Sequence, residues 1–213
     1  MDLLLASAAP AGYSDGVQPD FAEGVDEQMY ESLKAGIACL RSAGLSFLGW
    51  VEQVIRQILV LRAEPTRTKS GSRSHFPGLV HMSLPEGAHV VAENLMHEAS
   101  HQYYHLLLRI GPIHTGEDTA LYYSPAVGRP RPLDRLVLAF HAFGNVALLY
   151  HRLLEIGFAT RESRSQLDRL GLQLEQLRAP MVGNPALTLM GSEFIRPLNV
   201  ALVGRGIISE VKL

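Results

Sequence analysis

A histidine pair in the middle of the chain is the feature most able to do chemistry. The run His97-Glu98-Ala99-Ser100-His101 places two imidazoles four residues apart, with an acidic residue between them. On a helix, residues i and i+4 lie on one face one turn apart, so both rings can reach one divalent metal ion. Glu98 could act as a base, as an acceptor behind a ligand, or as a further ligand. The spacing therefore predicts a metal site on a helix.

Two histidines leave a metal ion short of ligands, because catalytic Zn²⁺ takes three protein ligands and non-haem Fe(II) takes three on one face. We expect His141 to be the third ligand, since it lies within a long apolar segment where a polar ring needs a partner. Glu155, near the end of that segment, is the carboxylate alternative. His105 lies one turn beyond His101, but three ligands in line on one straight helix cannot easily converge on one metal ion. Without a metal, His141 would be a core histidine bonded to a backbone carbonyl.

Regular apolar patterns predict the elements that must position these side chains. The histidine pair is expected on a helix over about residues 87–110, ended by Gly111-Pro112. Apolar residues at helical spacing predict further helices over 26–43, 45–55, 133–157, 163–177 and in the tail after residue 185. Apolar runs at 57–63 and 78–84, joined by a polar loop at 66–74, predict a small antiparallel sheet beside the helix with the histidine pair. The predicted fold class is mainly α (α+β).

The sequence predicts one domain that is preceded by a flexible segment and contains one long loop. Residues 1–24 are rich in Ala, Gly, Pro and Asp, so we expect a flexible N-terminal segment. The remainder, 25–213, is expected to form a single catalytic domain. Residues 114–132 show no regular pattern, and loops of that length are usually functional or disordered. The paired tyrosines Tyr122 and Tyr123 favour a functional loop.

Composition excludes some partners. The formal net charge of −2 gives no electrostatic reason to expect nucleic acid or an anionic membrane surface as a partner. No apolar run approaches the roughly 18 residues that a membrane-spanning helix needs. The first residues lack the basic stretch of a signal peptide, so we expect a cytoplasmic protein. The sequence does not fix the oligomeric state.

A set of short motifs gives the chain a family resemblance. From about Gly78 to Tyr150 it resembles a family of HExxH proteins that are found with ribosomally made, modified peptides. The shared parts, in order, are Phe76-Pro77-Gly78-Leu79-Val80, the HExxH helix, Tyr122-Tyr123-Ser124-Pro125, and Arg131-Pro132-Leu133 at the start of an apolar helix. The resemblance implies an Fe(II)- and 2-oxoglutarate-dependent oxygenase that hydroxylates a side-chain β-carbon in a precursor peptide. Many members of the family carry a histidine where this chain has Leu138, and His141 lies three residues further on.

The resemblance also implies roles for individual residues. His97, His101 and His141 would hold Fe(II), and Glu98 would orient a ligand or a bound water rather than act as a base.

The co-substrate would lie against the tyrosine loop and the residues after it. Arg131 would bind the distal carboxylate of 2-oxoglutarate with its guanidinium fork, with Arg129 as the second choice. Tyr122 or Tyr123 could donate a hydrogen bond to the same acid, although aromatic packing is the alternative role.

Two other functions stay open at this point. In a zinc-dependent metallopeptidase, Glu98 would be the general base that deprotonates a zinc-bound water. A non-catalytic metal-binding module would instead close its site with a fourth ligand, such as His105.

Overall fold

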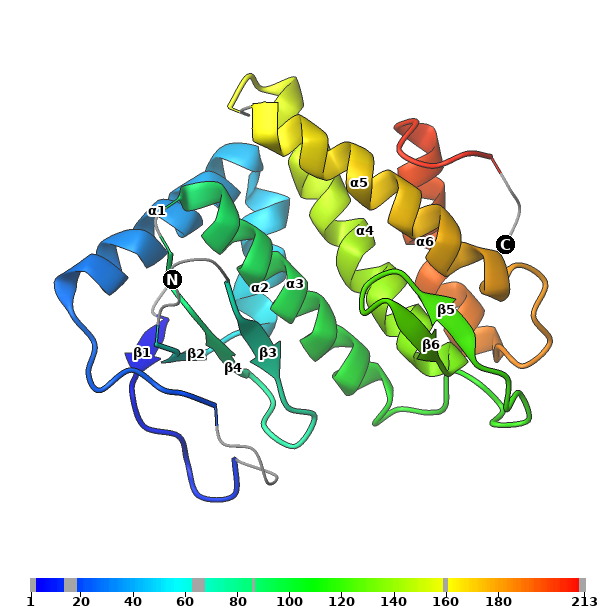
Figure 1. The fold of residues 1–213 in the computed structure, drawn as a ribbon, viewed down its shortest axis with the longest axis horizontal. Helices are drawn as coiled ribbons and strands as arrows, with labels where there is room; N and C mark the ends of the chain where they lie inside the picture. The colour runs from blue at the N-terminus through cyan, green and yellow to red at the C-terminus, as the bar shows by residue number, and fades with distance from the viewer. Residues whose placement is uncertain (1–2, 14–18, 63–67, 86, 159–160, 211–213) are drawn as a thin grey trace. The chain divides into compact units, whose positions relative to one another are not determined.

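Helices form most of the fold, and two small sheets complete it (Figure 1). The structure, a computed structural model, describes residues 3–13, 19–62, 68–85, 87–158 and 161–210. The expected fold class, mainly α with a small sheet, is confirmed. The chain divides into two compact units, residues 1–106 and residues 107–213. Two such units can belong to one catalytic domain, so the interpretation of 25–213 as a single domain stays a prediction.

The first unit contains a four-stranded mixed sheet with the strand order β1-β2-β4-β3 (Figure 1). Its strands are β1 (Leu4–Ala6), β2 (Gln57–Val60), β3 (Ser70–Ser72) and β4 (Leu79–Met82). β2 pairs in parallel with both β1 and β4, and only β3 and β4 are antiparallel. The sequence predicted an antiparallel pairing of the second and fourth strands. The sheet differs because β3, within the polar loop expected over 66–74, reverses the chain before β4 begins. Residues 66 and 67 of that loop, and residue 63 of the predicted strand, lie outside the described residues.

The N-terminal segment takes part in the first unit. Of residues 1–24, expected to be flexible, Leu4–Ala6 pair with β2, and Tyr13 is only 1% exposed. Tyr13 packs with Leu59 and Leu79 on one face of the sheet. Residues 1–2 and 14–18 of the segment lie outside the described residues. The N-terminal segment therefore adds an edge strand to the sheet and packs Tyr13 against one of its faces.

Three helices complete the first unit, close to their predicted bounds. They are α1 (Glu27–Ala43), α2 (Leu45–Val54) and α3 (Ala88–Leu107), whose last residue already belongs to the second unit. α1 begins after Asp26, whose side chain accepts a hydrogen bond from the backbone N–H of Met29, as an N-cap should. Gly36 lets α1 approach α3 closely, because a Cβ atom there would lie 2.4 Å from Cγ1 of Val91.

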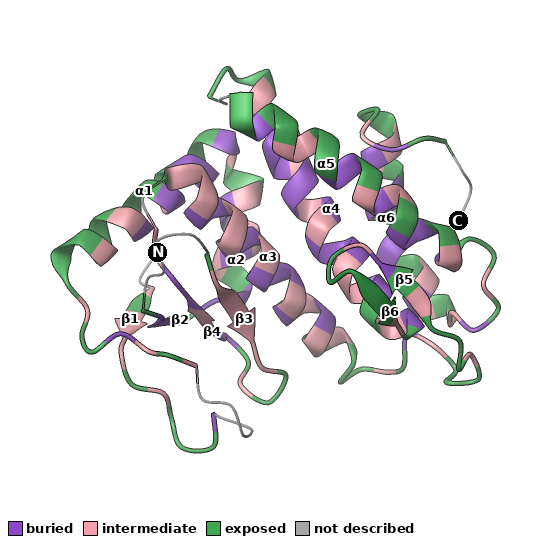
Figure 2. Ribbon diagram, viewed as in Figure 1, coloured by how far each residue is buried: buried purple, intermediate pink, exposed green. Residues whose placement is uncertain are grey.

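The second unit is built around one long helix. Its elements are β5 (Tyr122–Ser124), β6 (Arg129–Arg131), α4 (Leu133–Glu155), α5 (Arg161–Arg178), a short 3-10 helix (Ala179–Met181) and α6 (Leu189–Gly204). α4 packs against both α5 and α6, and buried positions recur along its length (Figure 2). The irregular stretch expected over 114–132 therefore contains an antiparallel hairpin, β5–β6.

Among the described residues, α4 has the length and hydropathy of a membrane-spanning helix, with a mean hydropathy of 1.2. Within the structure, 61% of that apolar window is buried. The core helix of a globular protein has the same properties, so this observation is weak evidence for a membrane.

Candidate metal centre

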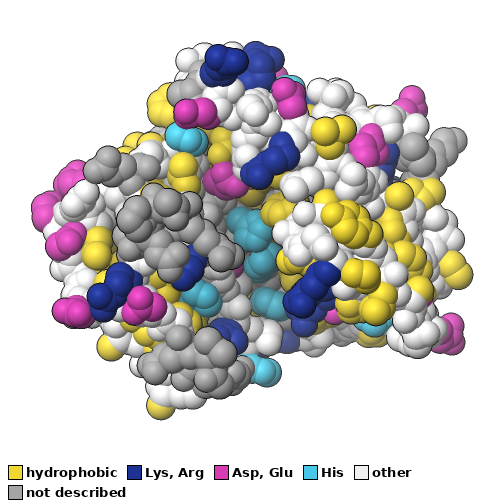
Figure 3. All heavy atoms as spheres, viewed as in Figure 1, with side chains coloured by type: hydrophobic (Ala, Val, Ile, Leu, Met, Phe, Trp, Pro, Cys, Tyr) yellow, Lys and Arg dark blue, Asp and Glu magenta, His cyan; other side chains and the backbone are white. Residues whose placement is uncertain are grey.

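α3 carries the histidine pair as the spacing predicts. The ring centroids of His97 and His101 lie 4.4 Å apart. The apolar residues of the helix, among them Leu95, Met96 and Ala99, are buried and fix its orientation in the first unit. Histidine side chains gather at the surface over α3 (Figure 3). The pair is thus held on a helix that packs into the first unit, and both residues are partly exposed.

His97, Glu98 and His101 together form a group of metal-ligand type. Each offers one donor atom, and the three donor atoms all lie within 4.8 Å of one another. In the described part of the chain, no second group of three His, Cys, Asp or Glu side chains comes as close together. Two imidazoles and a carboxylate suit Zn²⁺ or Fe(II). The structure therefore contains a candidate metal site, without indicating which metal it takes.

Glu98 is only 1% exposed and is an ionised carboxylate in spite of its burial. Its Oε1 accepts a 2.7 Å hydrogen bond from Oγ of Ser70, and its Oε2 lies 3.4 Å from Nδ1 of His101. Burial raises the pKa of Glu98, but the neighbouring His101, His97 and Ser70 outweigh burial and lower it to about 2.

The surroundings of Glu98 fit a cation. Oε2 makes no well-aligned hydrogen bond to any described residue. Buried polar atoms normally have partners, and Nδ1–H of His101, whose nitrogen lies 3.4 Å away, would be that partner if a metal ion held the ring through Nε2.

His97 is held in the neutral form that binds metals. Burial and the nearby His101 ring lower its pKa to about 4, and the Glu98 carboxylate offsets only part of this effect. A neutral imidazole has a free lone pair, so metal binding at neutral pH would not have to displace a proton from His97.

The sheet contributes Ser70, which sequence reasoning missed. Ser70 lies on β3, opposite Met82 of β4, on the sheet face that meets α3. The next residue, Gly71, pairs with His81 on the other face, where His81 is hydrogen-bonded to the Tyr13 hydroxyl at 2.7 Å. A Cβ atom on Gly71 would lie 2.5 Å from Nε2 of His81, so that face has no room for a side chain. The polar Ser-Gly-Ser run was the only signal in the sequence.

The predicted third ligands have other contacts. His141, on α4, is 3% exposed; its Nε2 lies 3.3 Å from Nδ2 of Asn145, and its ring lies 4.2 Å from that of Phe194. Glu155, at the end of α4, bonds to Arg152 at 3.1 Å. His105 has its ring centroid 6.5 Å from that of His101 and is not part of the close group. His141 as the third ligand stays a prediction.

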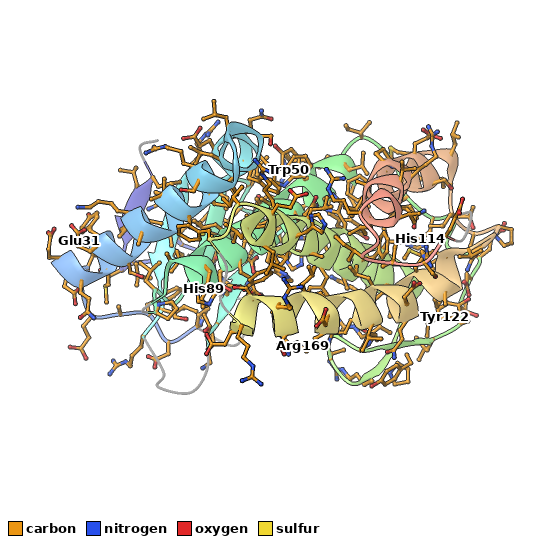
Figure 4. All side chains as sticks on the ribbon, turned by 90° about the horizontal axis from the view of Figure 1, so that it is seen from above. Glu31, Trp50, His89, His114, Tyr122 and Arg169 are labelled. Carbon is orange, nitrogen blue, oxygen red and sulfur yellow. The ribbon has the colours of Figure 1, made fainter. Side chains whose placement is uncertain are left out.

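The four residues predicted to bind the co-substrate all lie on the β5–β6 hairpin. Tyr122 is opposite Arg131, and Arg129 is opposite Ser124. The Tyr122 hydroxyl donates a 2.6 Å hydrogen bond to Asp118 (Tyr122 is labelled in Figure 4). Tyr123 points to the other face and is 57% exposed. Their co-substrate role stays a prediction.

Comparison with known proteins does not assign this donor set to a family. No family model and no curated protein sequence matches the chain.

Proposed function

We propose that the protein is an Fe(II)- and 2-oxoglutarate-dependent oxygenase that hydroxylates a side-chain β-carbon in a ribosomally made precursor peptide. Two features support the proposal: the His97-Glu98-His101 donor group on α3 and the order of motifs that resembles the HExxH proteins of modified-peptide pathways.

The observation that carries the proposal is the placement of Glu98. It is 1% exposed, its Oε1 accepts a hydrogen bond from Ser70, and its Oε2 lies 3.4 Å from Nδ1 of His101, so the carboxylate is placed to hold a ligand ring. This favours a reaction in which Glu98 orients a ligand over hydrolysis by a metallopeptidase, in which Glu98 would have to deprotonate water.

Each residue of the group then has a definite task. His97 and His101 would donate ring nitrogens to the iron. Because Oε2 of Glu98 lies beside Nδ1 of His101, the carboxylate favours a proton on Nδ1 and leaves Nε2 as the donor. Bound iron, 2-oxoglutarate and O₂ would together supply the oxidation, with one oxygen atom ending in the peptide and the other in succinate, beside CO₂. His141 and Arg131 remain the predicted third ligand and the predicted cation for the co-substrate.

A titration without oxygen tests the proposal. The protein loaded with Fe(II) under nitrogen should show a new visible absorption band when 2-oxoglutarate is added, and admitting O₂ should then yield succinate. His97→Ala and His101→Ala should lose both signals. His89→Ala, at the start of the same helix (Figure 4), is the matched control and should keep them.

Two results would count against the oxygenase. One is the absence of any 2-oxoglutarate binding to the Fe(II) protein. The other is peptide cleavage by the Zn²⁺ form that disappears in Glu98→Gln, which would point to the metallopeptidase.

A further inference from the structure

Asn94 carries a polar group that the fold leaves without a partner. The residue lies inside α3 and is partly exposed, but its amide nitrogen Nδ2 is buried. Nδ2 carries two N–H donors, and it makes no hydrogen bond to any residue that the structure describes. A buried donor without an acceptor lowers the free energy of unfolding. An acceptor from outside the chain would remove this cost.

The helix itself gives Asn94 no task. Asparagine is among the less favourable residues inside a helix, because its side chain competes with the backbone for hydrogen bonds. It is favoured where it caps a helix or where its side chain bonds to a nearby backbone group. Asn94 lies well inside α3, and its Nδ2 does not bond to the described backbone. Its amide therefore does not stabilise α3.

Asn94 shares the helix face of the metal donor group. It precedes His97 by three residues and Glu98 by four, so all three side chains lie on one side of α3, about one turn apart. Side chains on a helix lean toward its N-terminus, so the His97 and His101 rings lean toward the turn that contains Asn94. A molecule bound by the donor group on that side would lie near Nδ2.

Glu98 offers an acceptor on the same face but does not take the amide as its partner. Neither Nδ2 of Asn94 nor Oε2 of Glu98 makes a well-aligned hydrogen bond, so the two atoms are not bonded to each other. Oε2 lies 3.4 Å from Nδ1 of His101 instead. The acceptor for Asn94 is therefore a different atom.

Charge indicates what kind of acceptor fits. The donor group consists of two imidazoles, which bind metals in the neutral form, and one carboxylate. With a divalent ion the group has a net charge of about +1, which favours an anion as the next ligand. A carboxylate that binds the metal through one oxygen keeps lone pairs on its other oxygen, and such an oxygen is a strong acceptor for an amide N–H.

We propose that Nδ2 of Asn94 donates a hydrogen bond to the metal-bound carboxylate of the co-substrate, at the end of the molecule opposite the carboxylate predicted for Arg131. The identity of the co-substrate as 2-oxoglutarate rests on the proposed function. The hydrogen bond itself rests on the buried amide without a partner, on its place on the donor face and on the charge of the loaded site.

Titrations of the Fe(II) protein under nitrogen test the proposal. Asn94→Leu has a similar volume but no donor, and Glu93→Gln, on the adjacent residue, is the matched control. Asn94→Leu should bind 2-oxoglutarate about 10-fold to 100-fold more weakly than the control, as expected for the loss of a hydrogen bond to a charged group. Its affinity for the metal, measured by competition against a chelator, should not change. Equal 2-oxoglutarate binding by the two variants, or an equal loss of metal affinity, would overturn the proposal.

Pyruvate identifies the end of the co-substrate that Asn94 binds. Pyruvate has the 2-oxo acid group of 2-oxoglutarate but lacks the distal carboxylate. Asn94→Leu should therefore weaken the binding of both acids by the same factor. A loss confined to 2-oxoglutarate would assign Asn94 to the distal carboxylate, and the proposal would be wrong.

Asn94→Asp keeps the test decisive if Asn94→Leu does not fold. Aspartate has nearly the shape of asparagine but replaces the N–H donors with a negative charge. It should weaken 2-oxoglutarate binding while holding the metal at least as tightly, because it repels the acid and attracts the cation. Unchanged 2-oxoglutarate affinity in Asn94→Asp would show that the amide does not contact the acid.

Acetate separates this proposal from the oxygenase. If the unaltered Fe(II) protein binds no 2-oxoglutarate, the oxygenase is rejected, and the Co(II) form can be titrated with acetate and followed by its visible absorption. Acetate should bind to the unaltered protein, and Asn94→Leu should weaken it about 10-fold. Equal acetate binding by both proteins, or none by either, would overturn the hydrogen bond from Asn94.

Discussion

The hydroxyl of Ser70 donates a 2.7 Å hydrogen bond to Oε1 of Glu98, and this bond joins the edge strand β3 to the helix that carries the candidate metal ligands. The other carboxylate oxygen of Glu98 lies beside Nδ1 of His101. Ser70, Glu98 and His101 therefore form a chain of contacts that runs from the sheet to a ligand ring. Such contacts orient ligands and commonly change metal affinity when they are removed.

Ser70→Ala should weaken metal binding, because Glu98 would lose one of the two contacts that orient it behind His101. We expect a loss of about 10-fold in affinity for Zn²⁺ or Fe(II), at the lower end of the range for such supporting residues. Competition against a chromogenic chelator measures it. Ser72→Ala is the matched control, since Ser72 lies on the same strand and its buried Oγ makes no hydrogen bond to any residue that the structure describes. Equal affinities for the two variants would show that Ser70 does not support the site.

Glu98→Gln should keep part of the activity if Glu98 orients a ligand. The amide has nearly the same shape but no charge, so the His101 ring would be held less firmly. Succinate formation per bound iron should fall about 10-fold to 100-fold and remain measurable. Glu93→Gln, on the same helix and outside the donor group, should match the unaltered protein. Complete loss of turnover with full iron occupancy would restore Glu98 as an essential acid or base.

Local patterns were sufficient to predict the helix of the site. The apolar periodicity of α3 and its Gly-Pro stop gave its bounds to within a few residues, and the i, i+4 rule brought His97 and His101 together. Glu98 belonged to the same motif. These features depend only on residues that are close in the chain, so they can be predicted from the sequence alone.

Features that depend on distant pairing were not predicted. β3 is a Ser-Gly-Ser run without β-forming residues and is a strand only because β4 pairs with it. β6 contains Pro130, which argues against a central strand and is tolerated here because β6 is an edge strand. The role of Ser70 at the site was not predicted for the same reason, because its hydrogen-bond partner Glu98 is 28 residues away in the chain.

Arg178 should be a main source of stability in the second unit. It is 2% exposed, forms an ion pair with Glu175, and donates to Oδ1 of Asn199 at 3.3 Å and to the backbone C=O of Ser209 at 2.9 Å. Arg178→Met would leave these acceptors without their donor, at a cost of about 3 kcal/mol. Hydrogen exchange of the α5 amides would show the loss as faster exchange.

The control for Arg178 is Arg169→Met on the same helix. Arg169 is exposed and points away from the rest of the second unit (Figure 4). Its replacement should change the free energy of unfolding by less than about 0.5 kcal/mol. If the two variants exchanged at the same rate, the buried contacts of Arg178 would not contribute to the stability of α5.

Tyr13 should make the first unit lose stability in alkali. Burial raises the pKa of its hydroxyl from 10.0 to about 12. The unfolded chain then loses this proton near pH 10 and the folded chain near pH 12, so the free energy of unfolding is unaffected below pH 10 and falls between the two values. Tyr13→Phe should lower the free energy of unfolding at neutral pH by about 1 kcal/mol, through loss of the bond to His81. It should also flatten the slope of the free energy of unfolding against pH in alkali.

Urea unfolding followed by the fluorescence of Trp50, the single tryptophan, reports on this unit. Tyr30→Phe, on the exposed side of α1, is the control and should keep the slope. An unchanged slope in Tyr13→Phe would assign the alkaline loss to another group, such as Tyr103, whose pKa burial also raises.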